Sequence, residues 1–169
     1  MNDFKKILPK ELNKTAFEMI GTDWMLVTAK KPDGTINTMT ASWGGLGVLW
    51  NKDVCYVVIR PQRYTREFLD SADSFSLTFF PEEYKKELGY LGSVSGRDED
   101  KIAKSGLTKD EYDGIPYFKE ANTVMFARKL FAQQMTKEAF IEEGFAEEFY
   151  PAGDYHILYI GEIKEVLVK

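Results

Sequence analysis

The chain contains few of the side chains that enzymes use for chemistry without a cofactor. It has one histidine, His156, and one cysteine, Cys55, among 169 residues. A single histidine excludes a zinc site with two or more histidine ligands, and a Ser-His-Asp or Cys-His arrangement would have to use His156. We therefore predict no metal site and leave the catalytic residues unassigned. If the protein is an enzyme, we expect a cofactor to carry the reactive chemistry.

The lone cysteine also excludes an internal disulfide, and a free thiol fits a reducing compartment. Cys55 stands in the apolar, β-rich run 54–59, which is typical of a buried core thiol and not of a nucleophile. Residues 1–14 carry charges throughout and lack the apolar segment of a secretory signal. No apolar run is long enough to cross a bilayer, so we expect a soluble, cytoplasmic protein without membrane contact.

The chain also has no excess of basic residues. The 22 lysines and arginines and the 27 aspartates and glutamates give a net charge of −5. Binding a duplex needs a basic face, so nucleic acid is not expected as a partner, although a local basic patch can still hold one phosphate. With 44% apolar residues and no repeat or linker, residues 1–169 are expected to form a single domain with its own core.

Residue periodicity and turn residues predict a mainly β protein with helical insertions, of the antiparallel barrel type. The glycine-rich segment 44–47 is expected to be a flexible loop or a place of close backbone approach, and the length of the strand over 122–135 suggests a bulge. The six predicted strands cover residues 24–30, 36–43, 53–60, 75–80, 122–135 and 155–168. The predicted helices cover residues 10–20, 66–72, 82–91, 98–104 and 138–149.

Residues 60–65 read Arg-Pro-Gln-Arg-Tyr-Thr and stand between a predicted strand and a predicted helix. Arg63 can contact a phosphate through two N–H groups. Thr65 is placed as the N-cap of the helix, where free N–H groups and the helix dipole favour an anion. The alternative interpretation is a surface arginine beside an ordinary helix cap.

Residues 37–43 place an amide, three hydroxyls and an indole within seven positions. Alternation along a strand puts residues 37, 39, 41 and 43 on one face and residues 38, 40 and 42 on the other. The Asn37 amide suits the edge of a heteroaromatic ring or a ribityl chain, and Trp43 can cover a ring system. A sheet with one polar face and Trp43 in the core is the equally good alternative. Together the two segments indicate a phosphorylated, aromatic ligand.

With these residues the chain resembles the flavin reductase-like family of FMN-binding split barrels, particularly its flavoredoxin-like branch. The order and spacing of the shared motifs extend over nearly the whole chain. These motifs are Asn-x-Met-Thr-x-Ser-Trp at 37–43, Arg-x-x-Arg-Tyr-Thr at 60–65, Gly-Ser-Val-Ser-Gly-Arg-Asp-x-Asp-Lys at 92–101, Arg-Lys-Leu-Phe-Ala-Gln at 128–133 and His-Ile-Leu-Tyr-Ile-Gly-Glu-Ile at 156–163.

The resemblance implies a six-stranded antiparallel Greek-key split β-barrel, a homodimer, and FMN in a groove near the dimer interface. It also implies NAD(P)H-linked flavin reduction with NADH or NADPH as transient donor, or electron transfer through bound FMN to a redox protein partner. The residues implied to bind FMN are Asn37, Met39, Thr40, Ala41, Ser42 and Trp43 along the flavin and ribityl chain, Arg60, Arg63, Tyr64 and Thr65 at the phosphate, and Ser95, Gly96 and Lys101 from the third motif.

Two differences from the family pattern bear on the ligand pocket. Relatives often carry Gly-Asp-His before the last strand, whereas Tyr155 intervenes here before His156, so His156 is left out of the implied set. Phe131 and Gln134 stand where relatives commonly have Tyr and Asp.

Two alternatives to a flavin enzyme stay open. One is a flavin carrier or electron-transfer module without turnover, and the other is a different planar cofactor such as haem, with His156 as the candidate axial ligand.

Overall fold

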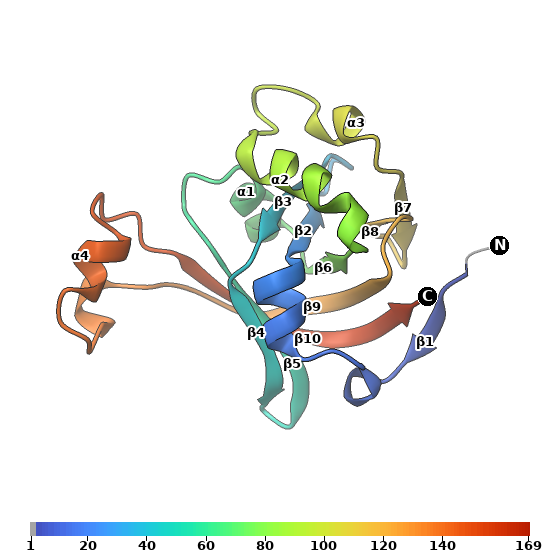
Figure 1. Ribbon diagram of the computed structural model, residues 1–169. Coiled ribbons are helices and arrows are strands. Elements are labelled where there is room, and N and C mark those ends of the chain that lie inside the picture. Colours follow the sequence, from blue (N-terminus) through green and yellow to red (C-terminus); the bar gives the residue numbers. More distant parts are fainter. Residues whose placement is uncertain (1–2) are drawn as a thin grey trace.

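The computed structural model describes residues 3–169, and its framework is one large antiparallel sheet that curls into a split barrel (Figure 1). The predicted mainly β class is confirmed, and the six predicted strands are present as β2, β3, β5, β6, β9 and β10. The strands are β1 (Lys5–Ile7), β2 (Met25–Lys30), β3 (Ile36–Ala41), β4 (Gly44–Leu49), β5 (Lys52–Ile59), β6 (Ser74–Phe79), β7 (Lys109–Tyr112), β8 (Ile115–Phe118), β9 (Thr123–Gln134) and β10 (Ile157–Val168).

The order of the strands explains the curl of the sheet. Hydrogen-bonded neighbours follow the order β3-β2-β6-β9-β10-β5-β4, and β1 pairs with β10. The two ends of this order, β3 and β4, are consecutive in the sequence and are joined only by Ser42 and Trp43. The sheet therefore has to bend until its two edges meet at these two residues, although the described strands show no β3–β4 pairing.

Alternating side chains along the strands build two separate apolar cores. Met25 and Val27 of β2 point into the barrel, whereas Leu26 between them points to a second core under the helices. On β9, Met125 and Phe126 divide in the same way. Strands covered on both faces carry nearly continuous apolar runs, and this is why the sequence pattern revealed them.

Short helices and a small hairpin cover one side of the sheet, where Figure 1 shows α2 lying across β3. The hairpin β7–β8 and the strands β1 and β4 were not predicted, so six strands was too low a number. The α-helices are α1 (Thr65–Ser71), α2 (Lys85–Ser93), α3 (Lys101–Ser105) and α4 (Phe145–Phe149). Shorter turns are the 3-10 helices Pro9–Glu11, Glu82–Tyr84 and Lys137–Ala139 and the π-helix Phe17–Asp23.

The predicted helix over residues 10–20 is wrong in its bounds. The helical segment starts only after Thr15, whose backbone N–H and hydroxyl both donate to the Glu18 carboxylate while the Glu18 N–H donates to the Thr15 hydroxyl. This reciprocal arrangement is a capping box, and it sets the start of the helix more strongly than the apolar spacing does. Of the apolar residues at helical spacing, Ile20 is buried and Leu12 and Ala16 pack against the barrel core, whereas Phe17 is 89% exposed.

The predicted helix over residues 138–149 is replaced by the 3-10 turn Lys137–Ala139 and the short α4. Gly144 interrupts it with φ +80°, a left-handed conformation that ends regular helix. Residues 136–155, here called the arm, leave the barrel between β9 and β10 and project far from it (Figure 1). Apolar residues at helical spacing over 138–149 predict that Ile141 faces a core, but its side chain is fully exposed.

The glycine-rich segment 44–47 lies in strand β4, so the expectation of a flexible loop is wrong. The other expectation, a place of close backbone approach, agrees with the structure. A Cβ atom at Gly44 would overlap the carbonyl oxygen of Tyr56, and one at Gly45 would overlap the Tyr56 ring. The glycines therefore allow β4 to pair with β5 while the Tyr56 ring lies over its backbone.

The expected irregularity of β9 is confirmed. Its register with β10 shifts between Ile160 and Gly161 and again between Ile163 and Glu165, and such bulges bend a long strand. Among the helices of residues 3–169, none is both long and apolar enough to cross a membrane.

Candidate functional site

A cavity of about 230 Å³ lies at the bend between β3 and β4, and we call it the bend pocket. It forms where the closing edge of the sheet brings the end of β3 next to the loop after β5 and the start of β10. Most of its lining was implied from the sequence, but Val58 and His156 were not. The lining residues are Met39, Thr40, Ala41, Ser42, Trp43, Val58, Arg60, Arg63 and His156.

Trp43 forms the aromatic wall of the bend pocket. Its side chain is 46% exposed, so the alternative of a core tryptophan is wrong. The indole packs edge-on against Phe149 of the arm at 6.0 Å between ring centroids, and it lies 5.2 Å from the His156 ring. The arm thus supports one side of the pocket and leaves a large face of the indole open to a ligand.

His156 is buried beside the pocket and is held by the arm. Its Nδ1 atom is 2.7 Å from the Tyr150 hydroxyl. Burial, together with the positive charge of Arg60, lowers the pKa of His156 to about 4. At neutral pH His156 is therefore an uncharged hydrogen-bonding group, and the positive charge of the bend pocket comes from its arginines.

Arg60 reaches the pocket but is also tied to the arm. One terminal nitrogen forms an ion pair with the Asp154 carboxylate, and the other donates to the Phe149 carbonyl oxygen over 2.8 Å. Gln62 donates to the same carboxylate over 2.8 Å, and the two contacts hold the pKa of Asp154 below its usual range. Arg60 therefore fixes the base of the arm in addition to lining the pocket.

Arg63 is the more available guanidinium. It is exposed, and within the described part of the chain its one hydrogen bond runs from Nη1 to the Gly92 carbonyl oxygen over 2.9 Å. That carbonyl lies in the last turn of α2, whose free carbonyls attract cations. Thr40 donates to the nearby Leu88 carbonyl oxygen, so the pocket wall and the end of α2 are joined.

Lys101 also serves the end of α2. Its ammonium group is buried and donates to the carbonyl oxygens of Leu91 and Val94 over 2.8 and 2.9 Å. Burial, with a smaller contribution from the charge of Arg63, lowers the pKa of Lys101 to about 8. This arrangement supplies a structural role for Lys101 that the sequence did not predict.

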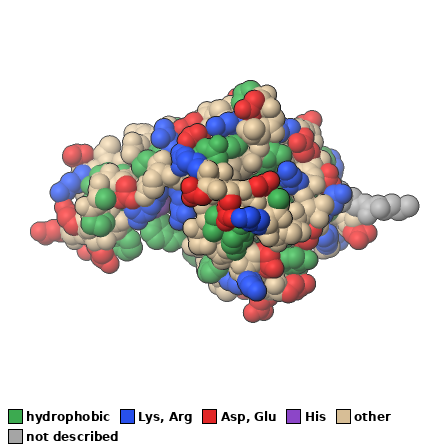
Figure 2. All heavy atoms as spheres, turned by 90° about the horizontal axis from the view of Figure 1, so that it is seen from above, with side chains coloured by type: hydrophobic (Ala, Val, Ile, Leu, Met, Phe, Trp, Pro, Cys, Tyr) green, Lys and Arg blue, Asp and Glu red, His purple; other side chains and the backbone are tan. Residues whose placement is uncertain are grey.

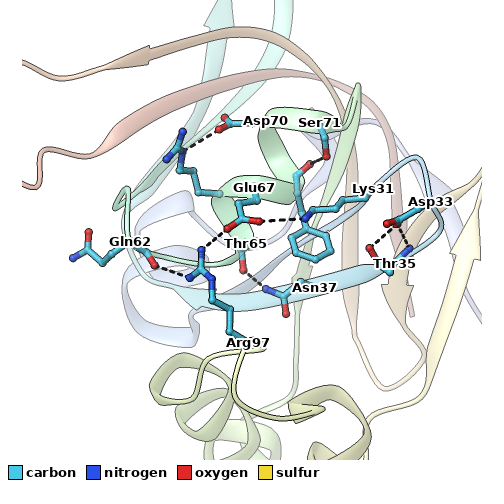
Figure 3. Close-up of polar contacts among 12 residues, drawn as sticks. Lys31, Asp33, Thr35, Asn37, Gln62, Thr65, Glu67, Asp70, Ser71 and Arg97 are labelled. Atoms are coloured by element: carbon cyan, nitrogen blue, oxygen red, sulfur yellow. Dashed lines mark hydrogen bonds and ion pairs between the residues drawn. The ribbon is translucent and has the colours of Figure 1, made fainter.

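Four of the six remaining implied residues line a different cavity. A groove of about 390 Å³ is lined in part by Asn37, Tyr64, Gly96 and Lys101. Asn37 donates its amide to the Thr65 hydroxyl over 2.9 Å, and both side chains are buried (Figure 3). The structure thus does not gather the implied set in one cavity, because seven members line the bend pocket, four line the groove, and Thr65 and Ser95 line neither.

The predicted cap of α1 is wrong. Tyr64, not Thr65, occupies the cap position of α1, and Thr65 is the first helical residue. Its hydroxyl is taken by Asn37, a partner distant in sequence. In α3, Asp100 is the cap residue and accepts a hydrogen bond from the Ala103 N–H over 3.1 Å.

The third motif is held in place by Tyr64. The Ser95 hydroxyl accepts the Arg97 N–H, and a Cβ atom at Gly96 would overlap the Asn37 amide oxygen. The Arg97 guanidinium lies over the Tyr64 ring at 4.6 Å. It is also bound by Glu67 and the Gln62 carbonyl oxygen (Figure 3). Arg97 is therefore committed to contacts within the protein.

The lining residues from the segments 39–43 and 60–63 were implied by the sequence, whereas Val58 and His156, from other parts of the chain, were not. Val58 enters because alternate residues of β5 face the bend, a signal that the strand prediction contained. Tyr150 positions His156 from the arm, and no pattern near either residue reveals that pairing. Cys55 is fully buried with its pKa raised to about 12 by burial, so its interpretation as a core thiol is confirmed.

The geometry can bind an anion next to an aromatic ring. Two guanidiniums, two hydroxyls at positions 40 and 42, and an open indole face converge on one cavity. Within residues 3–169, no group of three or more metal-ligating side chains occurs. These features fit a phosphorylated, planar organic ligand.

Comparison with known proteins identifies the family to which the chain belongs. No curated protein matches the chain in sequence. An FMN-binding domain of a flavin reductase-like enzyme from Shewanella baltica superposes with a TM-score of 0.70, at 16% identity, over 99% of this chain and 78% of its own. The flavoredoxin of Desulfovibrio vulgaris gives a TM-score of 0.68, at 24% identity, over 98% of this chain and 76% of its own. The flavoredoxin of Methanosarcina acetivorans gives 0.69, at 21% identity, over the same two shares.

These structures share the split-barrel fold with this chain. The family model of the flavin reductase like domain matches residues 17–169. That span includes every strand of the barrel except β1, together with both segments that line the bend pocket. The chain therefore belongs to the flavin reductase-like family of split-barrel domains.

Proposed function

We propose that this protein binds FMN at the bend pocket and acts as an FMN-dependent oxidoreductase. The observation that carries the proposal is the convergence of an open indole face, Trp43, with the guanidiniums of Arg60 and Arg63 in one cavity of a flavin reductase-like domain. The solved relatives named above include FMN-binding proteins and flavoredoxins. The reaction class proposed is NAD(P)H-linked flavin reduction or electron transfer through the flavin.

The residues present fit the chemical parts of FMN. Guanidinium groups match a phosphate with paired N–H donors, and Arg63 has donors to spare among its described contacts. The hydroxyls of Thr40 and Ser42 suit the ribityl chain, and the Trp43 face suits the planar ring. FMN, when bound, supplies the redox chemistry.

The protein's own part is to bind, orient and exclude water. Neutral His156 contributes a hydrogen-bonding ring nitrogen at the pocket without adding charge. Tyr150 fixes the plane of that ring through Nδ1, so the other nitrogen has a defined direction. The described residues of the pocket offer no carboxylate that would serve as a general base.

The proposal includes a homodimer. The bend pocket, at about 230 Å³, is smaller than the roughly 300–1,000 Å³ of typical ligand pockets. A ligand of the size of FMN would extend from it over the neighbouring sheet surface, where Tyr56 is 42% exposed. A second copy covering that surface would complete the site, and a large exposed apolar area supports such an interface.

The remaining proposals concern the cell and the electron source. A buried Cys55 without a disulfide partner among the described residues fits a reducing cytoplasm. NADH or NADPH is the proposed transient donor, and a redox protein is the proposed alternative partner.

The absorption spectrum of the purified protein tests the proposal directly. We expect an oxidised-flavin spectrum, or its appearance after adding FMN, and bleaching when NADH or NADPH is added without oxygen. A bound flavin that neither nucleotide bleaches would identify a carrier or an electron-transfer module fed by a protein. Protein that neither contains nor takes up flavin would refute the proposal.

Replacing Arg63 tests the position of the phosphate. A hydrogen bond to a charged group contributes about 1.5–3 kcal/mol, so Arg63→Ala should weaken FMN binding about 10- to 100-fold. Titration of the apoprotein with FMN, followed by flavin fluorescence, measures this change. Arg66→Ala is the matched control, since Arg66 pairs with Asp70 on the surface outside the pocket. Equal affinity of the two variants would place the phosphate elsewhere.

A further inference from the structure

The outer face of the β5, β10 and β9 strands is one continuous, partly exposed apolar surface. The register places Tyr56 opposite Ile160, and Ile160 opposite Phe131. Residues directly opposite in neighbouring strands share a face, so the three side chains form a row. Trp50, 54% exposed, joins the row through the Phe131 ring at 6.4 Å. We call this row the outer face.

One end of the outer face is basic. Lys52, Arg128 and Lys164 surround the Glu162 carboxylate at 3.1, 3.0 and 3.3 Å. The three cations hold the pKa of Glu162 at about 2, so the cluster keeps a net charge of +2 (3 − 1) at every physiological pH. Glu162 is opposite Arg128 and Val54 in the register, which places the cluster on the same face as Tyr56.

The other end of the outer face carries the acidic arm. Residues 137–148 contain one lysine and five glutamates, a net charge of −4 (1 − 5), and all six side chains are exposed. Figure 2 shows several acidic side chains at the projecting end of the molecule. Ile141 is fully exposed and Phe145 is 43% exposed, so the arm combines negative charge with uncovered apolar side chains.

The arm leaves the barrel on the side of the outer face. Its Phe149 packs on Trp43, a residue on the β4 side of the same surface. Along β9, Arg128 lies seven residues before Met135, a distance of about 23 Å at the rise of a strand. The acidic and basic groups therefore stand at opposite ends of one apolar face.

We infer that the arm of each protomer docks on the basic end of the outer face of a second copy. In this arrangement the two copies are related by a two-fold axis and pack antiparallel through their outer faces. The arm of each copy then contacts the basic cluster of the other, so the same contact is made twice. Each contact then joins Ile141 and Phe145 to apolar outer-face residues and the arm glutamates to the Lys52, Arg128 and Lys164 cluster. This inference rests on the proposed homodimer and specifies what holds it together.

A second copy fits this surface better than an unrelated protein does. A single chain carries the acidic arm at one end of the outer face and the basic cluster at the other. A two-fold axis pairs each arm with a basic cluster, so no other component is needed to neutralise the two charges. Electrostatic complementarity of this kind fixes the register of an interface. The same contact would cover the open side of the bend pocket, next to Trp43.

A charge-swap experiment tests the inference. The arm variant carries Glu138→Lys, Glu142→Lys and Glu143→Lys, which changes the net charge of residues 137–148 from −4 to +2 (4 − 2). The face variant carries Lys52→Glu and Lys164→Glu, which changes the net charge of the Glu162 cluster from +2 to −2 (1 − 3). Like charges in contact cost several kcal/mol, so each variant alone should raise the dimer dissociation constant about 100-fold or more. A 1:1 mixture should form a heterodimer, because a basic arm then meets an acidic face and an acidic arm meets a basic face. Sedimentation velocity measures the masses, and circular dichroism checks folding.

The control variant, Glu82→Lys and Glu83→Lys, raises the net charge by 4 at a 3-10 turn outside the arm, against 6 in the arm variant, and should leave the dimer intact. Wild-type protein should also dissociate more readily in 1 M salt, where the Debye length is about 3 Å. A monomeric wild type, an arm variant that dimerises like the wild type, or a mixture that stays monomeric would each overturn the inference. Flavin content is measured separately, so loss of FMN binding with an intact dimer contradicts only the proposed function.

Discussion

Acidification to pH 4 should remove about 3 kcal/mol of unfolding free energy through His156 alone. Burial and the charge of Arg60 lower the pKa of His156 to about 4 in the folded protein, against about 6.5 in an unfolded chain. Between these values the unfolded chain binds a proton that the folded protein does not. The stabilisation is therefore complete above pH 6.5 and is lost as the pH falls through 4.

The measurement is urea-induced unfolding of the wild type and of His156→Gln at pH 7, 6, 5 and 4. The assignment is unambiguous because the chain has one histidine, and the glutamine amide can still pair with the Tyr150 hydroxyl. Wild-type stability should fall about 2 kcal/mol further than that of the variant by pH 5 and about 3 by pH 4. Carboxylates such as Glu162 titrate in both proteins and cancel in the difference. Parallel pH profiles would show that His156 is not held neutral by the fold.

The same pKa matters for the site. A charged His156 would stand among Arg60, Arg63 and the ligand phosphate, whereas the neutral ring can only donate or accept one hydrogen bond at its free nitrogen. The Tyr150 hydroxyl, 2.7 Å from Nδ1, can donate to that nitrogen or accept from it, so it holds the orientation of the ring in either neutral tautomer. His156 was left out of the residues implied to bind FMN because Tyr155 breaks the family pattern. In the structure its ring nevertheless lines the bend pocket.

Long, strongly periodic strands were predicted well because burial on both faces leaves a nearly continuous apolar run that local sequence shows directly. All five residues of the segment 39–43 line the bend pocket, because one strand end supplies them together, and their part in binding FMN stays a prediction. The Thr65 cap failed for the opposite reason. A threonine before a helix favours an N-cap, but Asn37 reaches across the fold and takes its hydroxyl. Tertiary partners of this kind leave no trace in local spacing.

The arm shows a different limit. Apolar residues at helical spacing over 138–149 predict an amphipathic helix, and the structure instead exposes Ile141 and breaks the segment at Gly144. Helical stability in proteins comes mostly from packing of the apolar face, and within the described single chain the arm has little surface to pack on. A covering second copy would give these side chains the burial that their spacing anticipates.

Three glycines of β4 should respond to alanine in very different ways, and Gly44→Ala should cost about 3 kcal/mol of unfolding free energy. A Cβ atom at Gly44 would overlap the Tyr56 carbonyl oxygen, a backbone atom that is fixed by the β4–β5 ladder. Relief requires the two strands to separate at the start of β4, directly after Trp43. The same variant should therefore also weaken FMN binding.

Gly45→Ala and Gly47→Ala are matched controls in the same strand. The obstacle at Gly45 is the Tyr56 ring, which is 42% exposed and can swing outward, so this change should cost about 1 kcal/mol. A Cβ atom at Gly47 meets nothing within 4 Å, and alanine there should be neutral or stabilise by up to about 1 kcal/mol by restricting the unfolded chain. Urea unfolding of the three variants gives the order. Equal losses at all three positions would mean that these glycines supply general flexibility, as a loop would need. A loss confined to Gly44 and Gly45 would mean that they are required where the backbone and the Tyr56 ring approach.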